Sequence, residues 1–155
     1  MSDDDSRERA DALARDIART LWGLEGLSKA WGLEFDDAGA GWARCSLTLR
    51  EDMLNGHGTA HGGVIFALAD TAFAWACNSH NAQTVAQNAS ISFLSPGRLG
   101  ERLTAEAREE AKEGRSGVYT VRVFGEDGRD VAVFQGLSRT VGGPVIETDK
   151  ETGEK

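Results

Sequence analysis

The sequence predicts an α+β fold in which an antiparallel five-stranded sheet wraps around one long central helix. The first observation is an apolar run from Val64 to Cys77, interrupted only by Asp70 and its neighbour Thr71. The second is a train of alternating segments after it, and the third is the alternation of "GWARCSLTLR" before it. A helix that is apolar on nearly every side must be covered on every side. One sheet covers only part of such a helix, so a homodimer is expected from packing alone.

The first half of the chain supplies the helices of this prediction. Residues 5–22 show the spacing of an amphipathic helix, and residues 24–30 are expected to form a short turn. Residues 31–50 read as one extended segment, and residues 51–61 as a loop rich in Gly, Asn and His. The central helix is predicted from Gly62 to about Ser79, and its apolar part is shorter than the roughly 20 residues of a membrane span.

The second half supplies four of the strands. Alternation predicts strands in the segments 84–94, 101–112, 117–124 and 130–141. Pro96 and Gly97 predict the first turn, and Asp127–Gly128 predicts a hairpin. The composition of 101–112 favours a helix, but its alternation and its place between two turns favour a strand.

A chain of 155 residues has room for one hydrophobic core. We divide it into an N-terminal helical segment (1–30), the sheet-and-helix domain (31–143) and an acidic C-terminal tail (144–155). Most of the formal net charge of −8 comes from the two ends, which argues against nucleic acid as a partner. The N-terminus has no basic-then-apolar signal pattern, so a cytoplasmic location is expected, with no membrane partner. Cys45 and Cys77 lie in apolar segments and are expected to be reduced core thiols.

Asp70 is the residue that most needs an explanation. A buried, unpaired carboxylate costs several kcal/mol, and no Lys or Arg lies between Arg50 and Arg98. The carboxyl group therefore pairs with a distant arginine, takes up a proton or lines a cavity.

The residues before the helix offer groups that stabilise an oxyanion. Gly62 and Gly63 leave the first backbone amides of the helix uncovered, where the helix dipole favours negative charge. Asn55 and His57 are possible hydrogen-bond donors from the loop. Gly62 and Asp70 lie about 12 Å apart along one helix. Both reach one carbonyl group only if two copies place their helices antiparallel, which predicts an active site shared by two chains.

The stretch "MLNGHGTAHGGVIFALADTAFAWACNS" resembles the signature of hotdog-fold acyl-CoA thioesterases of the phenylacetate-degradation type. The resemblance covers roughly residues 39–143. It implies the hotdog fold, dimers that join two sheets, and usually homotetramers. The dimer expected from packing agrees with this.

The resemblance also implies roles for individual residues. The Gly62 N–H corresponds to the group that polarises the thioester carbonyl, and Asp70 to the catalytic carboxylate contributed by the opposite subunit. Asn55 corresponds to a group that holds the carbonyl or the attacking water, and His61 to an orienting group. Asn88 falls where relatives have a small polar residue on the strand facing the site.

Other groups concern binding. Gly63 is assigned to substrate binding with Arg98 and Arg115, two turn arginines whose guanidinium groups suit the phosphates of coenzyme A. The alternative for both is a solvated turn arginine. His57 and His61 have i, i+4 spacing but sit in a loop, so no metal is expected. No cofactor is expected either, since coenzyme A is part of the substrate.

The sequence therefore predicts an enzyme that hydrolyses acyl-CoA thioesters, with an aryl-acetyl or similar medium-sized acyl group. Asp70 would act as general base or as nucleophile. One alternative is a hotdog dehydratase or hydratase, which needs a His paired with an acid. The other is a non-catalytic acyl-CoA binding module, which gains nothing from an ionisable group beside the thioester.

Overall fold

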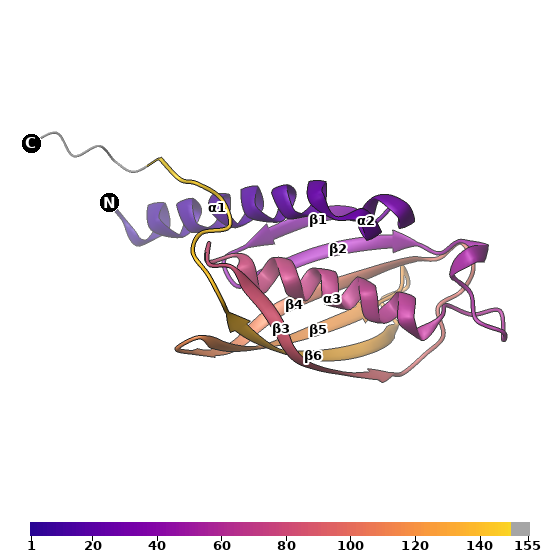
Figure 1. The fold of residues 1–155 in the computed structure, drawn as a ribbon. Coiled ribbons are helices and arrows are strands. Elements are labelled where there is room, and N and C mark those ends of the chain that lie inside the picture. Colours follow the sequence, from indigo (N-terminus) through magenta and orange to yellow (C-terminus); the bar gives the residue numbers. More distant parts are fainter. Residues whose placement is uncertain (150–155) are drawn as a thin grey trace, which may run out of the picture.

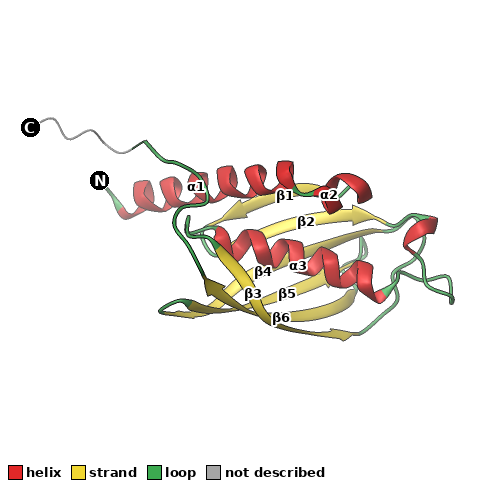
Figure 2. Cartoon of the chain, viewed as in Figure 1, coloured by secondary structure: helices red, strands yellow, loops and turns green. Residues whose placement is uncertain are grey.

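A computed structural model describes residues 1–149, so the end of the expected acidic tail, residues 150–155, lies outside the described part. One antiparallel sheet curves around a long helix, and a further helix lies alongside (Figures 1 and 2). The helices are α1 (Asp3–Leu24), α2 (Gly26–Trp31), the 3-10 turn η1 (Glu51–Met53) and α3 (Gly62–Asn78). The strands are β1 (Glu34–Gly39), β2 (Trp42–Thr48), β3 (Thr84–Phe93), β4 (Arg102–Glu113), β5 (Ser116–Phe124) and β6 (Asp130–Thr140).

The predicted strand count of five is wrong, because the sheet has six strands in the order β1-β2-β4-β5-β6-β3. The segment 31–50 is not one extended strand. It reverses at Ala40 and Gly41 into the β1–β2 hairpin, in which Gly39 pairs with Trp42. Gly41 has a φ of +78°, a left-handed conformation that glycine adopts at little cost. The predicted class, an α+β fold with a sheet wrapped around a central helix, is confirmed.

Helix α3 lies in the hollow of the sheet and forms the centre of the core. Its Leu68, Phe73 and Trp75 are buried against residues of β2, β4, β5 and β6. The helix approaches β6 closely, since a Cβ on Gly136 would lie 2.7 Å from the Phe73 ring. The sheet therefore fixes the rotation of α3, and with it the face that carries Asp70.

The N-terminal segment is more helical than expected. Helix α1 begins with a capping box between Ser2 and Asp5 and buries Ile17 against β1 and α3. The expected turn at 24–30 is the short helix α2, which ends at Gly32 with a φ of +67°. No helix within residues 1–149 is both long and apolar enough to cross a membrane. The two cysteines are buried, free thiols.

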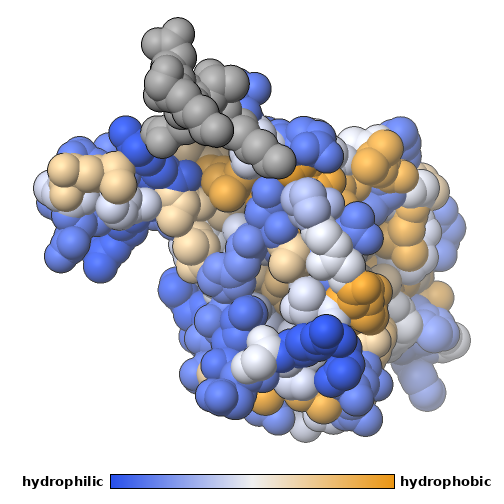
Figure 3. Space-filling model, turned by 60° about the vertical axis from the view of Figure 1, so that its left-hand side comes forward, coloured by the Kyte–Doolittle hydropathy of each residue, from blue (hydrophilic) through white to orange (hydrophobic). Residues whose placement is uncertain are grey.

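Strand β3 is an edge of the sheet with one unpaired side. Val85 and Phe93 on it are 50% and 54% exposed, which is high for large apolar side chains. A bulge between Ala86 and Asn88 changes which face the strand presents. On the face that Figure 3 displays, hydrophobic residues gather in separate patches on a mostly hydrophilic surface. The strand β3 edge is therefore the part of the sheet best suited to pair with another chain.

Candidate active site

A cavity of about 420 Å³ opens at the N-terminus of α3. Gly62 and Ile65 of the helix form one wall, and Asn55 and Thr59 of the preceding loop form another. The end of β3 closes it with Phe93, whose ring would lie 3.1 Å from a Cβ on Gly62. A side chain at Gly62 would therefore fill space that the cavity now offers to a ligand.

The cap of α3 leaves one backbone donor free. His61 is the N-cap residue, and its Nδ1 accepts a hydrogen bond from the Gly63 N–H at 2.9 Å. Because Nδ1 is an acceptor here, the neutral ring carries its proton on Nε2. The Gly62 N–H has no acceptor among residues 1–149. His61 thus engages the Gly63 amide, and the Gly62 amide remains available at the positive end of the helix dipole.

Asn55 shapes the loop beside this amide. Its Oδ1 accepts from the backbone N–H groups of His57 and Thr59, at 2.9 Å and 3.2 Å. Its Nδ2 donates to the Thr59 hydroxyl at 3.1 Å. Asn55 borders the cavity, but in this structure its side chain is engaged in holding the loop. The catalytic role assigned to it from the resemblance stays a prediction.

Asp70 is half-buried and forms no hydrogen bond or ion pair with any residue in the described part of the chain. The hydroxyl of Thr71 does not help it, since this group donates to the Ala67 carbonyl at 2.8 Å. Burial, and then the charge of Glu25, raise the pKa of the Asp70 carboxyl above its usual value. Of the alternatives for Asp70, pairing with a distant arginine does not occur within residues 1–149.

Asp70 and Gly62 do not share a cavity within one chain. Asp70 borders a second cavity of about 270 Å³, between α3 and the start of α2. Phe66, Ala67, Asp70 and Ala74 form a stripe along α3 that is only partly covered, while most other positions of the helix are buried. The two candidate catalytic groups therefore lie along one incompletely covered face of α3, about 12 Å apart by helical rise.

The remaining predicted residues are spread over the sheet. Ala89 of β3 pairs with Gly136, and this pair lies on the face of the sheet that contacts α3. Successive residues of a strand point to opposite faces, so Asn88 lies on the outer face of β3. Arg98 lies near the first cavity, because its backbone forms an isolated antiparallel β-bridge with Thr59, which lines that cavity.

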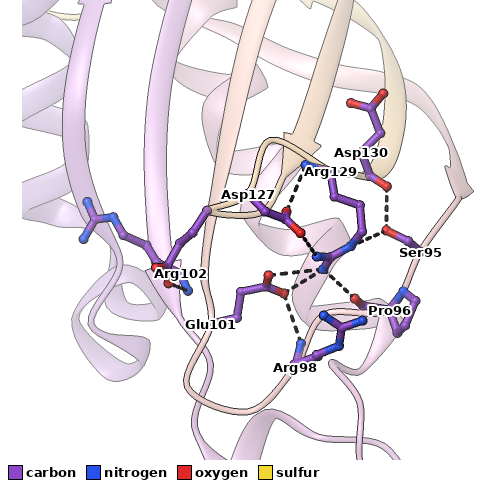
Figure 4. Close-up of polar contacts among 9 residues, drawn as sticks. Ser95, Pro96, Arg98, Glu101, Arg102, Asp127, Arg129 and Asp130 are labelled. Carbon is purple, nitrogen blue, oxygen red and sulfur yellow. Dashed lines mark hydrogen bonds and ion pairs between the residues drawn. The ribbon is translucent and has the colours of Figure 1, made fainter.

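The side chain of Arg98 is exposed and unpaired within the described residues. Its backbone N–H donates to Glu101, whereas Arg129 forms the ion pair with that carboxylate at 2.9 Å (Figure 4). Arg115 lies in the β4–β5 turn, at the end of the sheet opposite Arg98 (Figure 1). Within one chain the two arginines are thus not brought together.

Two further observations concern metal binding and a residue that was not predicted. No three side chains of His, Cys, Asp or Glu gather in a metal-binding cluster within residues 1–149. Glu25 borders the cavity of Asp70 and was not predicted as a site residue. It lies in the N-terminal helical segment, far from the motif, and no local pattern around it indicates such a position.

The comparisons with known proteins agree with this geometry. The model of the Thioesterase superfamily matches residues 57–132, which include Gly62, Asp70 and Thr59 of the cavity loop but not Asn55. Acyl-coenzyme A thioesterase PaaI of Escherichia coli is 38% identical over 128 residues, which cover 83% of this chain and 91% of that protein. This chain belongs to the thioesterase superfamily. The resemblance drawn from the motif is thereby confirmed, and this thioesterase is an enzyme with the hotdog fold.

Solved structures support the same assignment. The structure of E. coli PaaI, from the phenylacetic acid degradation operon, superposes with a TM-score of 0.85 at 37% identity and covers 86% of this thioesterase and 97% of PaaI. A Streptococcus mutans structure with bound acetyl CoA has a TM-score of 0.70 at 25% identity and covers 72% of this chain and 90% of that one.

Proposed function

We propose that this thioesterase hydrolyses acyl-CoA thioesters, with phenylacetyl-CoA, hydroxyphenylacetyl-CoA or a similar aryl or medium-chain acyl-CoA as substrate. The products are the free acid and coenzyme A. The names of the relatives, PaaI above all, support coenzyme A as the leaving group.

One observation carries the proposal. Two groups on the partly covered face of α3, the Gly62 N–H and the Asp70 carboxyl, have no partner within the described residues. Unpaired polar groups in partly buried positions cost free energy, and a substrate that supplies the missing partners offsets that cost. A thioester carbonyl with an attacking water supplies both, since its oxygen accepts from the amide and the water donates to the carboxylate.

The chemistry follows from these roles. The Gly62 amide at the helix N-terminus stabilises the oxyanion of the tetrahedral intermediate, where one donor typically contributes about 2.7–4 kcal/mol. As general base, Asp70 takes a proton from the water that attacks the carbonyl carbon; as nucleophile, its carboxylate attacks that carbon itself and forms an anhydride. The thiolate of coenzyme A then leaves, and in the anhydride route a water releases the acid.

The distance along α3 requires two chains. We propose a homodimer in which the α3 helices run antiparallel and the β3 edges pair, so that Gly62 of one chain faces Asp70 of the other. The exposed Val85 and Phe93 of β3 and the uncovered stripe of α3 support this arrangement. A dimer of such dimers, giving a homotetramer, is part of the same proposal.

A hydrolysis screen tests the substrate. Phenylacetyl, hydroxyphenylacetyl, benzoyl and straight-chain CoA thioesters are compared by thiol release, with kcat/KM as the readout. We expect the highest kcat/KM with an aryl-acetyl thioester. Hydrolysis of long straight chains in preference to all aryl thioesters would contradict the proposed substrate class.

Complementation tests the shared site. Asp70→Ala and Gly62→Pro chains, each inactive alone, are unfolded, mixed in equal amounts and refolded together. Half of the dimers in a random mixture are mixed, and each has one intact site, so about a quarter of the wild-type activity per chain is expected. No recovery in a mixture whose mixed dimers are verified by mass spectrometry would contradict a site shared by two chains.

The alternatives predict different results. A hydratase needs a histidine beside the acid and adds water to the acyl chain, so turnover of an acyl-CoA without thiol release would favour it. A binding module would retain acyl-CoA without thiol release, so equilibrium binding with no turnover would favour it.

A further inference from the structure

A second carboxylate faces Asp70 across its cavity. Glu25 is the residue between α1 and α2, where it caps the end of one helix and the start of the next. Together with Leu27 it forms the wall opposite Ala67 and Asp70 of α3. The N-terminal helical segment thus contributes a charged group to a cavity that the thioesterase motif describes only from the side of α3.

Glu25 is held in place by two buried donors. Its Oε1 accepts from the Trp75 indole Nε1 at 2.8 Å, and its Oε2 accepts from the Ser28 hydroxyl at 2.6 Å. Trp75 is 0% exposed and Ser28 is 1% exposed, so neither donor is free to turn to solvent. Both oxygens of Glu25 are thus fixed by hydrogen bonds, while Asp70 receives none from residues 1–149.

Neither acid of this pair forms an ion pair within the described residues, although Lys29 of α2 follows Glu25 by four positions. Arg19 of α1 lies over the Phe35 ring, 5.3 Å from its centroid. The other titratable groups near the pair are the thiols of Cys77 on α3 and Cys45 on β2.

Both thiols are neutral near neutral pH and do not offset the acids. Burial and the Asp70 charge raise the pKa of Cys77 to about 12. Burial, with the charges of Asp36 and Glu25, raises the pKa of Cys45 well above its usual value.

We propose that Glu25 is a positioning residue for the reaction, whose fixed negative charge makes the facing carboxylate of Asp70 a stronger base. Two like charges in one partly desolvated cavity disfavour the state in which both are ionised. The group without hydrogen bonds then holds its proton to higher pH, which brings its basicity closer to the pH at which the enzyme works. The inference rests on the proposed function, because it takes Asp70 as the group that reacts with water or substrate.

The test removes the charge in two variants, one of which keeps the shape of the side chain. Glu25→Gln retains an oxygen acceptor for a buried donor, and Glu25→Ser places a favoured N-cap residue at the start of α2. Glu8→Gln is the matched control, since it removes the same charge from an exposed position of α1. The carboxyl ¹³C shift of Asp70 is followed against pH by NMR, and the pH profile of kcat/KM is recorded in parallel.

We expect both Glu25 variants to lower the pKa of Asp70 by about half a unit or more, a shift typical of a removed neighbouring charge. The acidic limb of the kcat/KM profile should move to lower pH by the same amount, and Glu8→Gln should move neither. An Asp70 titration that coincides in the wild type and in a folded Glu25 variant would overturn the inference. Absence of turnover in the wild type would contradict the proposed function instead, and the NMR titration would still decide the role of Glu25.

Discussion

The polar groups at the C-terminal end of α3 have hydrogen-bond partners, whereas two polar groups in its N-terminal half have none within the described residues. At the C-terminal end, Asn78 bonds both ways with the backbone of Thr84, and the Ser79 hydroxyl donates to Ala76 and accepts from the Gly41 N–H. In the N-terminal half, the Gly62 N–H and the Asp70 carboxyl have no partner within residues 1–149. The residues at the C-terminal end are buried, whereas Gly62 and Asp70 lie on the partly covered face of the same helix.

The difference separates structural from functional polarity. A network with all partners present stabilises the fold and needs nothing further. A polar group left without a partner destabilises the free protein and is explained by what it binds. Substitutions in the two regions should therefore have opposite signatures, a loss of turnover in one and a loss of stability in the other.

The largest effect is expected at Asp70. Asp70→Asn keeps the shape of the side chain but removes the base or nucleophile, so kcat should fall by at least about 100-fold. The unfolding midpoint in urea should stay the same or rise, because an uncompensated charge has been removed from a half-buried site. Turnover close to that of the wild type would remove Asp70 from the mechanism.

The next effect concerns a single backbone donor. Gly62 is the first residue of α3, the position where proline is best tolerated, and His61 before it has a ψ of 134°, which suits a residue preceding proline. Gly62→Pro thus deletes the N–H with little cost to the helix. Its kcat should fall about 100-fold below that of Gly62→Ala.

Gly62→Ala is the matched control, because both variants place a Cβ close to the Phe93 ring and only proline lacks the amide hydrogen. Circular dichroism should show the same helix content in both. Equal kcat values in the two variants would mean that crowding of the cavity, and not the amide, matters at this position.

The N-terminal half of α3, with its unpaired groups, could be predicted from the sequence better than the other parts of the site. The charge of Asp70 inside an apolar run, and the two glycines at the start of the helix, are local features that physical chemistry flags without coordinates. They pointed to the functional face of the central helix, whereas the alternation of the later segments predicted the sheet and the resemblance of the motif predicted the thioesterase class. The roles assigned to Asn55 and Asn88 depend on partners and faces, and these are set by loop hydrogen bonds and a strand bulge that no periodicity reveals.

Contacts between distant segments could not be predicted. Glu25 and Asp70 are 45 positions apart along the chain. Glu25 reaches the cavity of Asp70 because α1 packs on β1 and α3. The missed strand has a more local reason. Residues 39–41 are all small and form the turn, but the prediction rested on the alternation within "GWARCSLTLR" and treated 31–50 as one continuous segment.

The fully paired polar network continues beyond the C-terminal end of α3, through His80 to Glu109 of β4, and should respond in stability and in its pH dependence. The Glu109 carboxylate accepts from the Tyr119 hydroxyl at 2.9 Å and contacts His80 Nε2 at 2.6 Å. Although burial opposes the charged form, these bonds hold the pKa of Glu109 below its usual value of 4.5. Glu109→Gln should lower the free energy of unfolding by about 1–2 kcal/mol at pH 7, with kcat unchanged.

The sign of the pH effect follows from the lowered pKa. The stabilisation by the Glu109 charge is present in full above pH 4.5 and is lost as the pH falls through the lower pKa of the folded state. Urea unfolding at pH 7 and at pH 4 should therefore give a smaller difference between wild type and Glu109→Gln at pH 4. A difference that grows on acidification would contradict the assigned direction.

The smallest effect concerns the arginines at the two ends of the sheet. Arg98 lies beside the Gly62 cavity with an unpaired, exposed side chain, and Arg98→Ala should raise KM for an acyl-CoA about 3- to 10-fold at unchanged kcat. With an N-acetylcysteamine thioester, which lacks the phosphates, the variant should match the wild type, and Arg7→Ala on exposed α1 should match it with both substrates.

Arg115 lies at the opposite end within one chain, but an antiparallel pair of α3 helices brings the Arg115 end of one chain toward the Arg98 end of the other. A phosphate-dependent rise in KM for Arg115→Ala as well would support the shared site, whereas an effect of Arg98→Ala alone would confine coenzyme A binding to the chain that supplies Gly62.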